Sequence, residues 1–387
     1  MLAVLAPGQG SQKPGFLAPW LDLPGAEGRL RWWSALAGND LRYLGTEAGA
    51  EEITDTAKTQ SLLVASALLA AEHLPMYDVA VVAGHSAGEL GAAALAGVLA
   101  PESAIALAGV RGRAMAAACA LEPTGMAAVL GGEPDEVVAA IEGAGLHPAN
   151  RNGAGQIVAA GPVAALEKLV AAPPAGARVR PLRVAGAFHT PYMAPAEQEL
   201  AGLAGGIRPG DPHKIFLSNL DGAAVTTGRE VVQRLIRQVI ASVRWDRCMQ
   251  SMAELGVTAI IELPPAGTLA GLVKRALPGV EIVKVETPDD LAKARDLVAR
   301  HGGKPGAQPA PRFRVVVGSA AGNFIPDPSL SEGSDIRSGQ VIGHVATRQG
   351  QVDVTAHDSG VLTEWLAHHD DPVAPGQPLA RIGGQLV

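Results

Sequence analysis

Residues 1–300 alternate between short apolar runs and longer helix-forming stretches, and few folds accept this pattern. "LAVLAP" at 2–7 and "VAVVAG" at 79–84 have the composition of buried strands, and each leads into a turn that contains glycine. "AIIEL" at 259–263 is a third such run, closed by two prolines. Strand–helix alternation predicts a mainly parallel, hydrolase-like α/β sheet with helices on both faces.

Residues 123–186 follow a different pattern, which predicts a small inserted subdomain. We expect a strand, a helix, two strands, a helix and a strand, in that order, at 126–130, 134–145, 147–152, 155–161, 163–172 and 178–184. The order βαββαβ is typical of ferredoxin-like folds. The larger α/β domain would then comprise residues 1–122 and 187–301.

The stretch "GGKPGAQPAP" at 302–311 is rich in Gly, Pro and Ala, which predicts a linker. Residues 312–387 would then form a separate module. The chain has 387 residues and 48% hydrophobic residues, so it is long enough for one large domain and a smaller one.

Charge and cysteine content narrow the setting in which the protein works. A net charge of −7 argues against a nucleic-acid partner, which usually requires a basic face. Cys119 and Cys248 are far apart in sequence, so we expect no disulfide framework and a cytoplasmic location. The N-terminus lacks the basic region of a signal peptide, and Pro101 and Glu102 interrupt the apolar segment 90–110, so we expect no membrane span.

Ser86 stands between two glycines in "GHSAG", directly after the expected strand at 79–84 and before a helix-like stretch. Gly-x-Ser-x-Gly in this context is a nucleophile elbow, which holds the serine hydroxyl at the N-terminus of the following helix. The helix dipole there stabilises developing negative charge. A plain Gly/Ser turn is the alternative, and the strand and helix around the motif favour the elbow.

A serine nucleophile needs a base, and His189 is the best placed of the ten histidines. It lies in "VAGAFHTPYMAP" at 184–195, where the chain returns from the small subdomain to the large one, and a cleft between two subdomains is a natural active site. Four histidines of the C-terminal part could in principle bind a metal but lack the usual ligand spacing; they are His344, His357, His368 and His369. We therefore expect neither a metal nor a cofactor.

Arg111 lies in the apolar helix-forming stretch 102–120, 25 residues after Ser86. An arginine among such neighbours usually extends its charged end to solvent. The alternative is a buried guanidinium that binds a carboxylate with two hydrogen bonds. Gly112, the next residue, would allow a backbone or a ligand to approach closely.

The segment "APGQGSQ" at 6–12 is a glycine-rich turn after the first expected strand. Neither of the common phosphate-binding patterns is complete in it. In elbow enzymes a loop after another strand donates the second N–H of the oxyanion hole, and Gln9 is suited to that role.

Seven motifs, taken together, resemble those of malonyl-CoA:acyl-carrier-protein transacylases over about residues 1–300. They are "PGQGSQ", "GHSAGE", "VRGRAM", "RNGAGQIV", "GAFHTPYM", "SNLDG" and "ELPPAGTLAGL". "EPTGMAAVLGG" and "VAGAFHTPYMAPA" are most similar to the actinobacterial members. The core motifs show no departure from the family pattern, although Ala87 stands where many relatives have Leu or Val.

The resemblance implies a role for each matching residue. Ser86 would be acylated by malonyl, with His189 as the general base. The main-chain carbonyl of Gln238 would orient the imidazole. The N–H groups of Gln9 and Ala87 would form the oxyanion hole.

The same resemblance implies the substrate contacts. Arg111 would bind the free malonyl carboxylate, and Asn150 and Asn152 would line the cleft. Phe188, directly before His189, would disfavour methylmalonyl, because related enzymes with "AFH" at this position prefer malonyl.

The implied reaction is transfer of malonyl from malonyl-CoA to the phosphopantetheine thiol of acyl carrier protein, in fatty acid biosynthesis. Three alternatives stay open: an acyltransferase of a polyketide pathway, a serine esterase or thioesterase acting on acyl-CoA, and a non-catalytic acyl-CoA or carrier-protein scaffold. A buried Arg111 would argue against an esterase, and intact Ser86 and His189 argue against a scaffold.

Residues 312–387 extend beyond the usual end of the family and resemble a biotinyl/lipoyl-type hammerhead barrel. The resemblance rests on "SGVL", the acidic turn and "VAPGQPLARI". Gln349 occupies the position of the cofactor-bearing lysine, and no lysine occurs after Lys304. We therefore expect a docking or oligomerisation module without an attached cofactor, which could contact a biotin- or lipoate-dependent complex.

Overall fold

The computed structural model describes residues 1–303, 313–348, 350–356 and 359–383. The chain divides into two compact units, Met1–Pro305 and Gly306–Val387. Most of the predicted linker at 302–311 lies outside the described residues, as do Gln349 and His357. Within the described ranges, no helix combines the length and the apolar character that crossing a bilayer requires.

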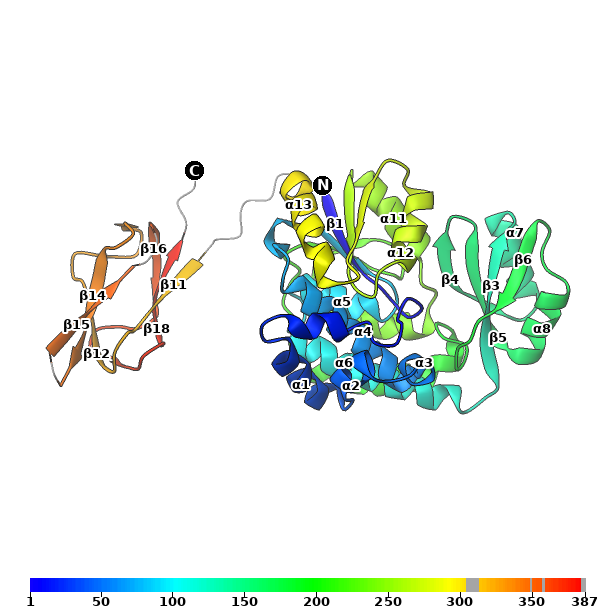
Figure 1. The fold of residues 1–387 in the computed structure, drawn as a ribbon, viewed down its shortest axis with the longest axis horizontal. Helices are drawn as coiled ribbons and strands as arrows, with labels where there is room; N and C mark the ends of the chain where they lie inside the picture. The colour runs from blue at the N-terminus through cyan, green and yellow to red at the C-terminus, as the bar shows by residue number, and fades with distance from the viewer. Residues whose placement is uncertain (304–312, 349, 357–358, 384–387) are drawn as a thin grey trace. The chain divides into compact units, whose positions relative to one another are not determined.

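A six-stranded sheet forms the centre of the first unit (Figure 1). Its strands, in spatial order, are β10 (Glu281–Lys284), β9 (Ala259–Glu262), β1 (Leu2–Ala6), β2 (Val81–Gly84), β7 (Ile215–Leu217) and β8 (Ala224–Val225). All neighbouring pairs are parallel except β7 and β8. The mainly parallel sheet that the strand–helix alternation predicts is therefore present.

Helices cover both faces of this sheet. The α-helices around it are α1 (Ala26–Ala37), α2 (Leu41–Thr46), α3 (Ala50–Thr54), α4 (Thr56–Ala71), α5 (Gly88–Leu95), α6 (Pro101–Cys119), α9 (Ala194–Leu203), α10 (Gly228–Arg237), α11 (Trp245–Glu254), α12 (Thr268–Ala276) and α13 (Leu291–His301). Alternate residues of β1 point to opposite faces: Val4 packs in the core with α4 and α6, whereas Leu5 packs with α11 and α12. Both residues are fully buried, as expected for a strand covered on both sides.

The small subdomain is a four-stranded antiparallel sheet with two helices, and its elements follow one another in the predicted order βαββαβ (Figure 1). They are β3 (Thr124–Gly131), α7 (Pro134–Gly143), β4 (His147–Gly153), β5 (Gln156–Pro162), α8 (Val163–Ala171) and β6 (Ala177–Pro181). The spatial order is β4-β5-β3-β6. β6 ends at Pro181 rather than at residue 184, because the chain turns at Leu182–Val184 towards the loop that carries His189.

The second unit contains two four-stranded antiparallel sheets around a small apolar core that includes Phe324, Ile342 and Leu379. The first sheet has the order β11 (Phe313–Val317), β18 (Pro378–Gly383), β16 (Gly360–Trp365) and β13 (Asp335–Ile336). The second has the order β15 (Gly350–Thr355), β14 (Val341–Thr347), β12 (Gly322–Pro326) and β17 (Pro372–Val373). This unit is therefore β-rich, with its own hydrophobic core.

Candidate active site

Ser86 occupies a sharp turn between β2 and α5, and its backbone has a left-handed φ of 53°. The turn requires glycine on both sides. A Cβ at Gly84 would lie 2.1 Å from the Gly88 carbonyl oxygen, and a Cβ at Gly88 would lie 2.2 Å from the Ala6 carbonyl oxygen. A left-handed serine held in a tight strand–turn–helix is the geometry of a nucleophile elbow.

His189 lies in the loop after β6 and also has a left-handed φ, of 58°. Its Nε2 is 2.7 Å from the Ser86 Oγ, and its Nδ1 is 2.9 Å from the Gln238 main-chain oxygen. Because a carbonyl can only accept, Nδ1 carries the proton and Nε2 is free to accept from the serine hydroxyl. Burial and the nearby Arg111 guanidinium lower the pKa of His189 to about 3, so its imidazole is neutral at physiological pH.

Arg111 is buried in the middle of α6, with 2% of its surface exposed, so its side chain does not extend to solvent. Its guanidinium donates to the Oε1 atoms of Gln60 and Gln238, the latter at 2.8 Å, and one of its nitrogens is 3.4 Å from the Ser86 Oγ. Burial lowers the pKa of Arg111 to about 10, which still leaves it charged. A buried cation therefore stands beside the candidate nucleophile.

Gly112 allows the close approach that places Arg111 against α4. A Cβ at Gly112 would lie 2.8 Å from the Thr56 carbonyl oxygen, at the start of α4. The partner that approaches at this glycine is thus the backbone of α4, which carries Gln60 one turn further along.

Three buried residues that the sequence analysis did not single out complete the hydrogen-bond network: Gln60, Glu89 and Asn219. The Asn219 side chain accepts from the Ser86 N–H at 2.8 Å and donates to the Gly84 carbonyl at 2.7 Å, so it fixes the elbow. Glu89 accepts from the Asn219 N–H at 2.8 Å and from the Gln238 side chain. Burial raises the pKa of Glu89 to about 7. "SNLDG" and the last residue of "GHSAGE" were the available signals for Asn219 and Glu89, whereas Gln60 lies in none of the seven motifs.

The two expected oxyanion donors lie at the ends of neighbouring parallel strands. Ala87 is the residue before the first turn of α5, and Gln9 follows β1, which pairs with β2. Within the described part of the chain, neither main-chain N–H donates to another protein group. The Gln9 side chain instead donates to the Thr54 carbonyl at 3.1 Å, which holds the loop in place.

The remaining predicted site residues are all buried. The Asn152 Oδ1 is 2.9 Å from the Nε2 of His85, the residue before Ser86, so Asn152 supports the elbow from the small subdomain. Asn150 is on the same strand, β4, but its side chain forms no hydrogen bond with Ser86 or His189 in the described structure. Phe188 is 8% exposed and directly precedes His189.

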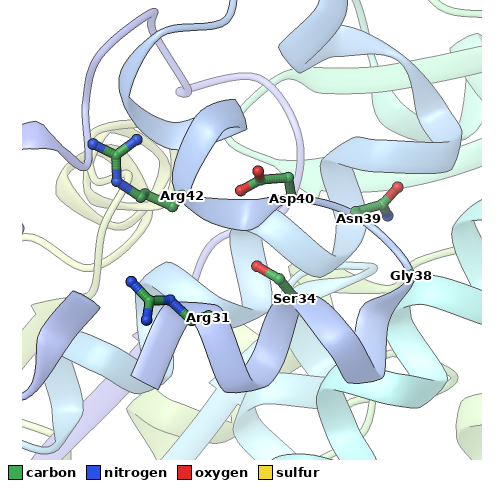
Figure 2. Close-up of a pocket in the computed structure, with 6 residues that line it drawn as sticks. All are labelled: Arg31, Ser34, Gly38, Asn39, Asp40 and Arg42. Atoms are coloured by element: carbon green, nitrogen blue, oxygen red, sulfur yellow. The ribbon is translucent and has the colours of Figure 1, made fainter. Parts of the chain in front are cut away.

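Other surface features lie apart from this network. A pocket of about 370 Å³ between α1 and α2 is lined by Arg31, Ser34, Gly38, Asn39, Asp40 and Arg42, none of which contacts Ser86 or His189 (Figure 2). Among the described residues, no group of three or more His, Cys, Asp or Glu side chains is arranged to hold a metal ion. Both cysteines are free thiols.

Comparison with known proteins identifies relatives for most of the chain. The family model of the acyl transferase domain matches residues 5–288. The malonyl CoA-acyl carrier protein transacylase of Mycobacterium tuberculosis (strain H37Rv) is 53% identical over 302 residues, which are 77% of this chain and all of that protein.

Solved structures of malonyl-transacylases also match this chain. The crystal structure of the Mycobacterium tuberculosis transacylase superposes with a TM-score of 0.74 at 53% identity, covering 76% of this chain and 99% of that one. A structure of a type II polyketide synthase acyl-carrier protein in complex with its malonyl-transacylase gives a TM-score of 0.70 at 29% identity, with coverage of 76% and 99%.

Proposed function

This chain belongs to the acyl transferase domain family, and from that premise we propose that it transfers malonyl from malonyl-CoA to the phosphopantetheine thiol of acyl carrier protein in fatty acid biosynthesis. The single observation that carries the proposal is the buried Arg111 guanidinium 3.4 Å from the Ser86 Oγ. An acyl group that ends in a carboxylate would pair with this cation while its thioester carbon meets the serine.

The first half-reaction forms a malonyl-serine ester. The His189 Nε2 takes the proton of the Ser86 hydroxyl, 2.7 Å away, as the oxygen attacks the thioester carbonyl. The Gln238 carbonyl accepts from the His189 Nδ1–H, which fixes the imidazole in the tautomer that the reaction needs. The proton then passes from Nε2 to the sulfur of the departing CoA.

We assign the oxyanion hole to the main-chain N–H groups of Gln9 and Ala87. Ala87 adjoins the nucleophile at the N-terminus of α5, where unpaired N–H groups and the helix dipole stabilise negative charge. Gly8 is required for the approach of the Gln9 loop, because a Cβ at Gly8 would lie 2.6 Å from the His85 carbonyl oxygen.

In the second half-reaction the carrier-protein thiol attacks the malonyl-serine ester. His189 acts again as the base, now for the thiol, and returns the proton to Ser86. An esterase or thioesterase would use water at this step, but it has no use for a buried cation beside the nucleophile. The scaffold alternative does not account for the Ser86–His189 hydrogen bond.

Three further residues would shape the substrate cleft: Phe188, Asn150 and Asn152. We assign Phe188 to the exclusion of methylmalonyl, because its buried ring directly precedes the catalytic histidine. Asn152 holds His85 beside the elbow, and we place Asn150 in the lining of the cleft.

A polyketide pathway is the second setting, which the structural match to a type II polyketide malonyl-transacylase favours.

We also propose that residues 312–387 form a biotinyl/lipoyl-like hammerhead barrel that serves docking or oligomerisation. The two antiparallel four-stranded sheets with a common core support the barrel, and the absence of lysine after Lys304 argues against an attached cofactor. A biotin- or lipoate-dependent complex is the partner that this likeness suggests.

We propose that the catalytic domain comprises residues 1–122 and 187–301, the small subdomain residues 123–186 and the linker residues 302–311. We place the protein in the cytoplasm.

The test of the proposed function is a transfer assay with purified components. The full chain is incubated with malonyl-CoA and holo-acyl carrier protein, and apo-carrier protein is the control. We expect malonyl on the holo form only, because the apo form lacks the phosphopantetheine thiol. Release of free malonate without carrier acylation would favour the thioesterase.

A further inference from the structure

Arg111 and Glu89 lie on opposite sides of one side-chain amide, that of Gln238. The Arg111 guanidinium donates to the Gln238 Oε1 at 2.8 Å, and the Gln238 Nε2 donates to the Glu89 Oε2. In the described part of the chain, Arg111 forms no direct ion pair with a carboxylate; its other hydrogen bonds go to Gln60 and Ser86. The amide dipole is therefore aligned between a buried cation and a buried anion.

The surroundings of Glu89 fit the ionised carboxylate. The side chain is 1% exposed, and the groups that hydrogen-bond its oxygens, the Asn219 N–H, the Gln238 amide and the Ser218 hydroxyl, all favour the charged form. The titratable groups around it are Arg111 on α6, His189 on the loop after β6, which interacts with Arg111, and Cys248 on α11, which interacts with Glu89. Burial keeps the last two neutral, because it lowers the pKa of His189 and raises that of Cys248. Glu89 and Arg111 are therefore the charged pair of this cluster.

We propose that Glu89 is the counter-charge of Arg111 in the empty site, and that it takes up a proton when a malonyl carboxylate pairs with Arg111. The proposal rests on the proposed function, because it assumes that Arg111 binds the malonyl carboxylate. It makes Glu89 a positioning residue with a second role: its charge determines how strongly the site favours a charged acyl group over a neutral one.

Charges in a buried site are most stable when their signs balance. One cation faces one anion before binding, and the malonyl carboxylate adds a second anion within the same low-dielectric region. Neutralising Glu89 restores the balance, and burial has already brought its pKa to about 7, so the proton is available near neutrality. Malonyl should consequently bind better to the protonated form, which dominates at lower pH.

The observable is the ratio of acyl-enzyme formation rates with malonyl-CoA and acetyl-CoA, followed by intact-mass spectrometry from pH 6 to pH 8. Contributions of His189 and of the CoA phosphates are common to both substrates and cancel in the ratio. The malonyl carboxylate stays ionised over this range, and Arg111, whose pKa is about 10, stays charged. We expect the ratio to fall roughly 5- to 20-fold from pH 6 to pH 8 in the native protein.

Glu89→Gln removes the titrating group, so its ratio should be independent of pH between 6 and 8. Glu102→Gln is the matched control, because it neutralises a half-buried carboxylate in the first turn of α6 and should retain the native slope. A native ratio constant within about twofold, or an unchanged slope in Glu89→Gln, would overturn the proposal.

Proton uptake provides a test that does not depend on the variant folding. Formation of the malonyl-enzyme passes the serine proton to the CoA sulfur and is otherwise proton-neutral. Calorimetry of the native protein at pH 7.5 in two buffers of different ionisation enthalpy should therefore give an uptake of roughly half a proton per malonyl adduct, and none with acetyl-CoA. Zero uptake with a malonyl adduct present defeats the inference alone, whereas absence of any adduct defeats the proposed function.

Discussion

Ser86 and His189 are 103 positions apart, both have left-handed backbones, and their side chains meet at 2.7 Å. Such a conformation is uncommon for residues other than glycine and persists where the surrounding structure requires it. For Ser86 that structure is the β2–α5 turn, held by Asn219. For His189 it is the bond from Nδ1 to the Gln238 carbonyl, which joins the loop after β6 to η5 (Gln238–Ile240).

Replacing His189 with Ala should slow formation of the malonyl-enzyme by about 10²- to 10⁴-fold, because the general base is lost. The variant can be measured by rapid-quench mass spectrometry, with circular dichroism to show that it is folded. In the native enzyme the pKa of His189 is lowered to about 3, so the base is neutral above that pH. Acidification from pH 8 to pH 5 should therefore not remove it. A loss of activity in that range that follows protonation of His189, detected by NMR of the imidazole, would contradict this assignment.

Arg111→Ala should reduce malonyl transfer and narrow the ratio of kcat/KM for malonyl-CoA to that for acetyl-CoA by about 10²-fold, since a charge-assisted pair of hydrogen bonds is lost. Arg113→Ala is the matched control. Arg113 lies on the same helix, is exposed, and bonds only to the Ala37 carbonyl among the described residues, so the ratio should stay unchanged. An equal ratio in the native and Arg111→Ala proteins would show that Arg111 does not recognise the carboxylate.

Gly88→Ala should destabilise the elbow by about 3 kcal/mol, because the new Cβ meets the Ala6 carbonyl oxygen at 2.2 Å and the core offers no room to relax. Gly91→Ala on the same helix is the control. Its Cβ would lie 3.6 Å from the Ala6 side chain, an ordinary contact, and the better helix former should add up to about 1 kcal/mol. Urea unfolding of both variants measures the difference, and equal stabilities would refute the steric account of the turn.

A chain that ends at Gly303 should keep its kcat/KM for malonyl transfer within about threefold of the full chain. The first unit has its own core, and stopping there keeps the bond from the Gly303 N–H to the Asp78 carbonyl that closes α13 onto the body. The comparison needs both proteins at equal concentration, with their masses in solution determined by light scattering. If the shortened chain is folded but inactive, the second unit contributes to catalysis and the proposed division of labour is wrong.

The sequence was sufficient where a local pattern determines the structure. The GHSAG turn identifies Ser86, because strand, glycines and helix are contiguous, and alternation alone predicts the parallel sheet. The position of His189 gave a weaker indication, which the family motif strengthened.

Gln60 could not be found in this way. Its contact with Arg111 joins residues 51 positions apart and depends on how α4 packs against α6 at Gly112. Nor does the sequence indicate that Gln238 supplies two functional groups, its carbonyl to His189 and its side chain to both Arg111 and Glu89.

Intact-mass spectrometry of the full chain and its Ser86→Ala variant after incubation with malonyl-CoA tests the central claim most directly. Ser86 is the proposed nucleophile, and the roles assigned to Arg111, His189 and Glu89 all depend on it. We predict one malonyl adduct on the native protein, located by peptide mapping to the segment that contains Ser86, and none on Ser86→Ala. A malonyl adduct of equal yield on Ser86→Ala would contradict the account.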